Sequence, residues 1–428
     1  MKLVGLAWRN LWRNRRRSMV TISSLTFGFA AIAIFAGYTH AIYAGLGNTA
    51  IYAEGVGHLV LNRLDWEVKG KLDPGKYLFT PDEVNKVRQI VQDALPKADV
   101  IPRLQLAGLL SNGVNSSIFI ANGITPEDQH RLLGPFKTRH GMLDNDKPMG
   151  GVVAEGLAGM LGLKVNNFAS ILVSTVNGQA NALDLDVIGI VNTGNIATND
   201  KAVTLPLAMA QTLLDAAGRA DYLTVLLPEL NDEAKMDVFR WAFESIPPDA
   251  AYMNALKARL ESRFKAAGLQ LQVRTWQEMS VFYRQVKTMY DMIFTLILCV
   301  VVAIVVLSIA NSVTMSVVER TREIGTLRAI GVRRHGVITL FMYEAFILVF
   351  LGLLLGAVLM VLVRAGVNGS GITYVPPANT VAVPLYIGVD WLRSAVAAGA
   401  ITLLALFAAL LPAYKAAYRS IVESLGHV

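Results

Sequence analysis

The sequence predicts an integral membrane α-helical protein, with four transmembrane helices and a large α+β extracytoplasmic domain between helices 1 and 2. The first observation behind this prediction is composition, because a mean hydropathy of +0.45 and a charged fraction of 17% are unusual for a soluble protein. The second is a set of apolar runs, each close to the ~20 residues that cross ~30 Å of hydrocarbon. These runs cover residues 19–44, 292–318, 337–363 and 391–411.

The third observation is the placement of the basic residues, which gather beside the apolar runs. Basic residues in loops that flank transmembrane helices favour the cytoplasmic side. We therefore expect both termini and the loop between the second and third helices in the cytoplasm, with residues 51–290 outside. The basic residues are Lys2, Arg9, Arg13, Arg15, Arg16 and Arg17 before the first run, Arg320, Arg322, Arg328, Arg333 and Arg334 in the middle loop, and Lys415 and Arg419 after the fourth run.

The N-terminal region divides into a basic cytoplasmic segment, residues 1–18, and a first transmembrane helix with its stalk, residues 19–50. Signal peptides also place basic residues before an apolar run, but this run is too long for one. Tyr38, Ile42 and Leu46 continue at helical spacing past the expected membrane edge. The helix is therefore expected to project from the bilayer.

Residues 51–275 are expected to form the extracytoplasmic domain. Thr80 and Pro81 predict the start of a helix over residues 81–95, because threonine is a good N-cap and proline suits the first helical position. Strand patterns over residues 104–124 and 171–191 each turn at an Asn-Gly pair, as hairpins do.

Other segments of the same domain alternate between strand and helix patterns. A β-rich insertion at about residues 125–205 is expected to divide the domain into two subdomains. The further strands are expected at residues 57–65, 222–227 and 269–275, and the further helices at 155–163, 232–244 and 251–267.

Residues 276–318 are expected to form a second stalk that continues into the second transmembrane helix. One apolar face of this segment carries Met279, Phe282, Val286, Met289 and Ile293. A continuous helix from Trp276 to Tyr290 would extend about 20 Å beyond the bilayer at ~1.5 Å per residue. The face is expected to hold an apolar substrate or to pack against a second copy.

The C-terminal third of the chain completes the topology. Residues 336–363 form the third transmembrane helix, 364–390 an extracytoplasmic loop, 391–413 the fourth helix and 414–428 a cytoplasmic tail. Pro376, Pro377 and Pro384 make the loop too irregular to cross lipid.

No catalytic or cofactor motif is recognisable. Residues 70–77, GKLDPGKY, imitate a phosphate-binding loop, but Tyr77 stands where a small hydroxyl should coordinate magnesium. The six histidines are scattered, and Cys299, the only cysteine, lies within the second apolar run. The sequence therefore predicts no metal, no cofactor and no enzymatic activity in this chain.

The segment between the second and third apolar runs, residues 319–335, combines charge with a short apolar stripe. In a helix over residues 317–330, Ile324, Leu327 and Ile330 would share one face, as in a helix lying on a membrane surface. Glu319 and Glu323, however, would repel each other unless arginines or a partner offset them. Membrane contact and partner binding both fit the periodicity, and the two acids favour a partner.

At this segment the sequence resembles a known family. ERTREIGTLRAIG, residues 319–331, resembles the coupling-helix signature of the ABC permeases of the MacB, FtsX and LolC/LolE group, the type VII or mechanotransmission transporters. Residues 6–18, 57–61, 176–190 and 411–425 resemble other parts of these permeases. The tail departs from the family, which often has a proline where Ser420 or Ile421 stands here.

The resemblance implies a free-standing permease without a fused ATPase. It implies a pair of permeases, identical or paralogous, in which each copy binds a cytoplasmic ATPase subunit that holds ATP and Mg. The residues expected to bind the ATPase are Glu319, Arg320, Arg322, Glu323, Ile324, Gly325, Leu327, Arg328 and Gly331. The expected location is the bacterial inner membrane.

The resemblance also narrows the expected activity. An outer domain of this size suits the MacB and LolC/LolE branches, and we expect lipoprotein-release-like extraction of a lipidated or apolar substrate, with a periplasmic adaptor or lipoprotein as a further partner. Efflux of small molecules or peptides is the first alternative. FtsX-like transmission of ATPase motion to a periplasmic enzyme or sensor is the other.

Overall fold

The computed structural model describes residues 2–70, 72–139, 141–227, 238–376 and 379–421. The chain divides into two compact units. The helical unit comprises Met1–Ile42, Lys287–Ile372 and Leu385–Val428, and the α/β unit comprises Tyr43–Val286 and Thr373–Pro384. Two expectations fall partly outside the described residues: the first part of the helix over 232–244 and the end of the tail.

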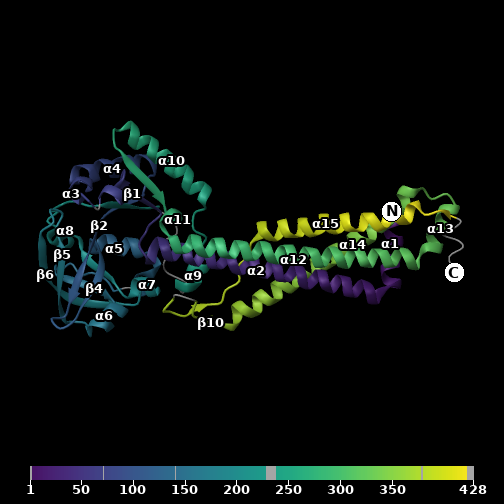
Figure 1. The fold of residues 1–428 in the computed structure, drawn as a ribbon, viewed down its shortest axis with the longest axis horizontal. Helices are drawn as coiled ribbons and strands as arrows, with labels where there is room; N and C mark the ends of the chain where they lie inside the picture. Colours follow the sequence, from purple (N-terminus) through teal and green to yellow (C-terminus); the bar gives the residue numbers. More distant parts are fainter. Residues whose placement is uncertain (1, 71, 140, 228–237, 377–378, 422–428) are drawn as a thin grey trace. The chain divides into compact units, whose positions relative to one another are not determined.

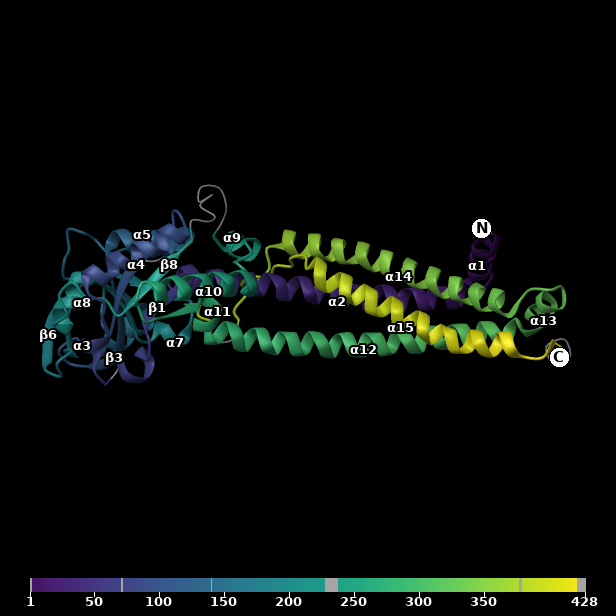
Figure 2. The same cartoon turned by 90° about the horizontal axis from the view of Figure 1, so that it is seen from above.

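The helical unit is built from long helices that run along one another (Figures 1 and 2). Within the described residues, four helices are long and apolar enough to cross a membrane: Arg15–Ala53, Val281–Glu319, Arg334–Ser370 and Trp391–Tyr418. The four-helix prediction is therefore confirmed. The helices of this unit are α1 (Lys2–Arg13), α2 (Arg15–Asn48), α12 (Val281–Glu319), α13 (Thr321–Ala329), α14 (Arg334–Ser370) and α15 (Trp391–Tyr418).

Small residues let these helices pack closely. Ala397, Ala405 and Ala409 of α15 are fully buried in the helical core. A Cβ added at Gly352 of α14 would overlap the side chain of Leu25 in α2. Close backbone approach at small residues is the usual way in which transmembrane helices associate.

Two predicted helices are each interrupted by one residue, so the prediction of continuous helices was wrong at both places. The short helix α11 (Trp276–Met279) ends at Ser280, whose extended backbone separates it from α12. Similarly, α12 ends at Glu319, and Arg320 (φ −114°, ψ 16°) leaves helical geometry before α13 begins. At its other end α14 continues to Ser370, past the expected boundary at residue 363.

The α/β unit contains a nine-stranded sheet in the order β3-β7-β4-β6-β5-β2-β8-β1-β9 among the described residues. The 13-residue strand β2 is shared by two halves of this sheet: residues 99–103 pair with β8, and residues 104–111 pair with β3. The strands are β1 (Leu59–Arg63), β2 (Asp99–Ser111), β3 (Ser116–Ile124), β4 (Gly150–Ala154), β5 (Phe168–Ser174), β6 (Ala180–Val191), β7 (Ala202–Pro206), β8 (Tyr222–Leu226) and β9 (Leu271–Thr275).

Each half of the sheet has its own hydrophobic core. The first core lies around α4 (Pro81–Ala94), α10 (Ala250–Ala266) and Trp276, and the second around α6 (Glu155–Leu161) and α8 (Leu207–Leu214). The second core already includes Leu104 of β2, well before the insertion boundary expected near residue 125. The remaining short elements of the unit are α3 (Pro74–Tyr77), α5 (Pro126–Leu133), α7 (Ile196–Asn199), α9 (Val238–Glu244), β10 (Thr373–Tyr374), β11 (Val383–Pro384) and the turns Thr49–Ala53, Trp66–Gly70 and Gly134–Arg139.

Locally determined features match the sequence prediction. The Thr80 backbone N–H donates to the Glu83 carboxylate at 2.9 Å, and the Glu83 N–H donates to Thr80 Oγ1, which together cap α4. Both predicted hairpins form, and Gly113 and Gly178 supply the left-handed backbone conformation that their turns require.

Candidate functional site

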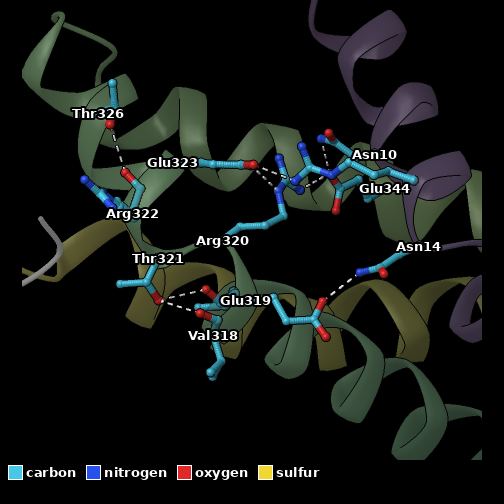
Figure 3. A network of polar contacts seen from close by, with 12 residues as sticks. Asn10, Asn14, Val318, Glu319, Arg320, Thr321, Arg322, Glu323, Thr326 and Glu344 are labelled. Carbon is cyan, nitrogen blue, oxygen red and sulfur yellow. Dashed lines mark hydrogen bonds and ion pairs between the residues drawn. The ribbon is translucent and has the colours of Figure 1, made fainter. Parts of the chain in front are cut away.

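The segment α13 is joined to the long helices by a buried ion pair at the interruption that precedes it. Arg320 Nη1 lies 2.7 Å from Glu344 Oε1, and the two side chains are only 5% and 6% exposed. Glu344 belongs to α14, so the pair connects two helices (Figure 3). Arg320 leaves the helical path because its guanidinium turns inward to meet Glu344, which explains why one helix from residue 317 to 330 does not form.

The buried carboxylate of Glu344 has a second donor. Asn10 Nδ2 of α1 donates to Glu344 Oε1 at 2.7 Å, and the Arg320 guanidinium also lies over the Phe341 ring, 5.7 Å from its centre. A buried charge is tolerated only when charge and hydrogen bonds compensate its lost hydration. This cluster therefore holds α1, α13 and α14 together through a buried ion pair and a partly buried hydrogen bond.

The two acids that the sequence left uncompensated are paired with arginines of the same chain. Glu323 lies 2.6 Å from Arg13 and 3.0 Å from Arg320, and Glu319 lies 3.2 Å from Arg17. Burial alone would raise the pKa of the Glu323 carboxyl, but hydrogen bonds from Arg320 and Arg13 outweigh it and lower that pKa. The repulsion between the acids is thus offset without a partner.

Helix α1 supplies two of these partners, and its sides differ in character. Ala7 is buried, and Asn10 and Arg13 reach the polar cluster. Trp8 and Trp12, by contrast, are exposed. A basic helix with exposed tryptophans suits the interface between membrane and water. The sequence identified this segment only as basic.

A second set of contacts ties α13 and the first residue of α14 to the end of α15. The Arg328 guanidinium donates to the carbonyl oxygen of Arg419, and Arg334 stacks on the Tyr418 ring at 4.5 Å. Figure 2 shows α13 beside the end of α15. Helix α13 is therefore braced on more than one side instead of forming a flexible loop.

The residues expected to bind an ATPase are distributed between surface and interior. Ile324, only 4% exposed, packs in the helical core with Gly325 buried beside it, whereas Ile330 is 74% exposed. Binding of an ATPase by these residues stays a prediction. Only the exposed residues among them can touch an ATPase directly. Of the predicted residues, Glu319, Arg322, Glu323 and Gly331 are exposed, Leu327 and Arg328 are half-buried, and Arg320, Ile324 and Gly325 are buried.

The apolar face predicted for the second stalk is shortened by the break at Ser280. Met279 lies before the break in α11, where its sulfur is 3.8 Å from Arg274 Nη1. On α12, Phe282, Val286 and Ile293 are half-buried and Met289 is 49% exposed. The structure therefore leaves four residues of the predicted face on one helix.

Glu344 and Asn10 are the site residues that sequence reasoning missed. A signal for Glu344 was present, because an acid inside an apolar run is rare and marks a functional or structural partner. No comparable signal singles out Asn10. Among the described residues, no cluster of histidine, cysteine and acidic side chains could hold a metal ion.

Residues 295–421 match the family model of the FtsX-like permease C-terminal domain. A stretch of 46 residues is 52% identical to an uncharacterized ABC transporter permease of Methanocaldococcus jannaschii, covering 11% of this chain and 12% of that protein. Another 84 residues are 38% identical to the macrolide export ATP-binding/permease protein MacB of Salmonella paratyphi A, covering 19% and 13% of the two chains. The matched stretches thus span about an eighth of these relatives.

Two solved structures are also similar. The periplasmic region of MacB from Actinobacillus actinomycetemcomitans aligns with 53% of this chain and 92% of its own, at 12% identity and a TM-score of 0.32. The extracellular domain of the transporter YknZ from Gram-positive bacteria aligns with 51% and 99%, at 14% identity and a TM-score of 0.31. Residues 295–421, which include α13, are thus similar to the FtsX-like permease C-terminal domain, and shorter stretches of the chain are similar to ABC transporter permeases.

Proposed function

We propose that this chain is the membrane subunit of an ABC transporter and that α13 binds a separate cytoplasmic ATPase subunit, which holds ATP and Mg. The observation that carries the proposal is the rigid mounting of α13. Its inner side is fixed by the buried Arg320–Glu344 pair, while Arg322, Thr326 and Ile330 remain exposed. The FtsX-like family of residues 295–421 supports an ATPase as the partner.

The mounting would let a movement of the ATPase reach the long helices. Because Glu344 is on α14 and Arg328 contacts the residue just after α15, displacing α13 would pull on both helices. Helix α12 ends next to α13 and contains 39 residues, a length of about 58 Å at ~1.5 Å per residue. This length exceeds the ~30 Å hydrocarbon core, so a displacement of the α13 end of α12 would move the part of α12 that lies beyond the opposite membrane surface.

The proposal includes a location and a subunit arrangement. Both termini and α13 would lie in the cytoplasm of a bacterium, with the chain inserted in the inner membrane and paired with a second permease. The one-sided distribution of arginines supports this orientation.

The docking proposal is tested with Ile330→Asp, because Ile330 is exposed and the substitution leaves the core intact. An aspartate buried without a partner at the interface costs several kcal/mol. We expect loss of ATPase co-purification and of permease-stimulated ATP hydrolysis, with normal membrane insertion. Ile372→Asp, at an exposed isoleucine just after α14, is the matched control. Normal ATPase binding by Ile330→Asp would contradict the docking proposal and favour the alternative, in which α13 lies on the membrane surface.

For the substrate we propose a lipidated or apolar molecule, as in lipoprotein release, with efflux of small molecules as the second candidate. The apolar face at Phe282, Val286, Met289 and Ile293 supports the first. The relatives named for macrolide export favour the second.

The two candidates are separated by a photo-crosslinking amino acid at Met289. A lipoprotein substrate should be captured there before ATP is added and lost afterwards. Met315, equally exposed on the same helix but near its other end, is the matched control. Capture of a second permease alone, or no capture, would leave small-molecule efflux as the better proposal.

A further inference from the structure

The α/β unit contains a cavity of about 280 Å³ that neither the family nor the ATPase proposal explains. It lies between the π-helical turn Thr49–Ala53, the start of α12, the turn after β6 and the segment before β11. Apolar and aromatic side chains form much of its wall, among them Leu46, Phe136, Phe282, Tyr283 and Val383. Its size is near the lower end of the range for small-molecule sites, ~300 Å³.

One carboxylate faces this apolar space. Glu54 borders the cavity and also a neighbouring one of about 150 Å³. Its backbone N–H donates to the Thr49 carbonyl oxygen at 2.8 Å, which fixes it at the end of the turn. Glu54 keeps exposed surface because it borders open space, yet the protein around it raises the pKa of its carboxyl by desolvation.

The carboxylate of Glu54 has no paired counter-charge among the described residues. No hydrogen bond or ion pair reaches its carboxylate from any residue that the structure describes. Several other polar groups of the wall have partners within the protein. Asn192 Oδ1 accepts from the Gly194 N–H and from Thr380, Asn195 Oδ1 accepts from the Ala197 N–H, and Ser280 Oγ accepts from the Tyr283 N–H.

We propose that this cavity binds a small amphipathic organic cation, an amine with an apolar or aromatic body, whose ammonium group pairs with Glu54. A desolvated carboxylate without a partner is costly, and a bound ammonium would offset that cost. The rings of Phe136, Phe282 and Tyr283 supply apolar surface and can attract a cation through their faces. A divalent metal fits less well, because it needs several oxygen ligands and Glu54 is the only carboxylate among the described residues of the wall.

The segment that follows α14 closes one side of the cavity. Asn379 forms a β-bridge with Asn195, and the Thr380 N–H donates to the Gly194 carbonyl oxygen at 3.1 Å. These backbone contacts hold Val381 and Val383 against the cavity. The site is therefore assembled before a ligand arrives, which lowers the entropic cost of binding.

The test uses the full-length chain in detergent micelles without an ATPase, so its outcome is independent of the docking proposal. The probes are 2-naphthylmethylamine, a cation at neutral pH, and 2-naphthylmethanol, a neutral molecule of the same shape. Equilibrium dialysis against a micelle-only blank gives both dissociation constants. We expect the amine to bind at least about tenfold more tightly than the alcohol.

Three variants locate the effect. Glu54→Gln should make the two probes bind equally, by weakening the amine alone. Asp93→Asn, at an exposed carboxylate of α4 in the same unit, should keep the tenfold preference. Val381→Trp should fill the cavity and weaken both probes. The proposal is overturned if the wild-type chain binds neither probe, if it binds both equally, or if Glu54→Gln retains the preference for the amine.

Discussion

The two units of this protein bury ionisable groups in different ways. In the helical unit Arg320 and Glu344 are buried as an ion pair at 2.7 Å. In the α/β unit burial instead favours the neutral forms: it lowers the pKa of His58 to about 4 and raises the pKa of Asp221 to about 7. His58 Nδ1 accepts a hydrogen bond from the Leu227 N–H, as only the unprotonated nitrogen can.

The difference follows from what each group connects. Arg320 and Glu344 lie on different segments, and a charged pair between them resists any displacement of α13 relative to α14. His58 and Asp221 instead border the strands β1 and β8, which backbone hydrogen bonds already hold together. One Asp221 oxygen accepts from the Gln105 N–H, and the other has no hydrogen-bond partner among the residues that the structure describes. Charge therefore connects two segments at Arg320 and Glu344, whereas burial disfavours the charged form at His58 and Asp221.

The largest expected effect comes from breaking the buried pair. Arg320→Met leaves the buried Glu344 carboxylate with only the neutral Asn10 as donor, and Glu344→Leu leaves the buried Arg320 with only Glu323, so each should lower the free energy of unfolding, by up to about 3–5 kcal/mol. The double variant removes both charges and should recover most of this loss. SDS titration of the chain in mixed micelles measures the effect, with Arg322→Met at an exposed arginine as the control. Additive losses in the double variant would show that the two side chains act independently.

The next effect is a pH dependence of the α/β unit. Between about pH 4 and 6.5 the unfolded chain protonates His58 while the folded chain does not, so this group makes stability fall as pH falls. Asp221 acts oppositely: its folded pKa is raised from 3.8 to about 7, so its contribution is present at low pH and is lost as pH rises toward 7. In the wild-type chain the two trends should largely cancel.

Single variants should therefore reveal each trend. In His58→Gln only Asp221 changes its protonation on folding, so the free energy of unfolding should fall as pH rises. In Asp221→Asn only His58 does, so the free energy of unfolding should increase as pH rises. Each slope can reach ~1.4 kcal/mol per pH unit. Urea unfolding of the full-length chain, followed by tryptophan fluorescence across this window, measures them. Identical slopes in the wild-type and both variants would mean that neither group changes its protonation on folding.

The smallest effect is expected at an exposed counterpart of the buried pair. Arg393 of α15 lies 2.7 Å from Asp291 of α12, and these side chains are 24% and 37% exposed. Lys287 also lies 2.5 Å from Asp291. Because water screens such contacts, Asp291→Asn should cost less than about 1 kcal/mol in the same SDS titration. A loss equal to that of Glu344→Leu would show that burial is not what distinguishes the two pairs.

The parts of this fold that could be predicted are those set by neighbouring residues. Thr80, Pro81 and Glu83 define the start of α4 within four positions, and the Asn-Gly pairs define their hairpins in the same way. The four long helices follow from runs of apolar residues. In each case the physical cause lies within one helix or one turn.

The parts that could not be predicted depend on residues far apart in the sequence. Arg320 interrupts its helix because its guanidinium pairs with Glu344 of α14, which also accepts a hydrogen bond from Asn10 of α1. Glu319 and Glu323 suggested an external partner, because the arginines that pair with them, Arg13 and Arg17, lie some 300 positions earlier and no local pattern connects them. Likewise, β2 belongs to both halves of the sheet because its pairing changes between Arg103 and Leu104, and no local pattern marks that position.

The position of β1 within the sheet has a consequence for how the chain is made. Leu59 pairs with Val225 on one side and with Thr275 on the other, so β1 has no strand partner until those residues have been synthesised. Ribosomes add ~5–20 residues per second, so residues 60–225 take ~8–30 s to emerge. Throughout this interval an apolar strand with two open edges is available for misassembly. Strand β1 can complete its pairing only after β8 and β9 have both been synthesised.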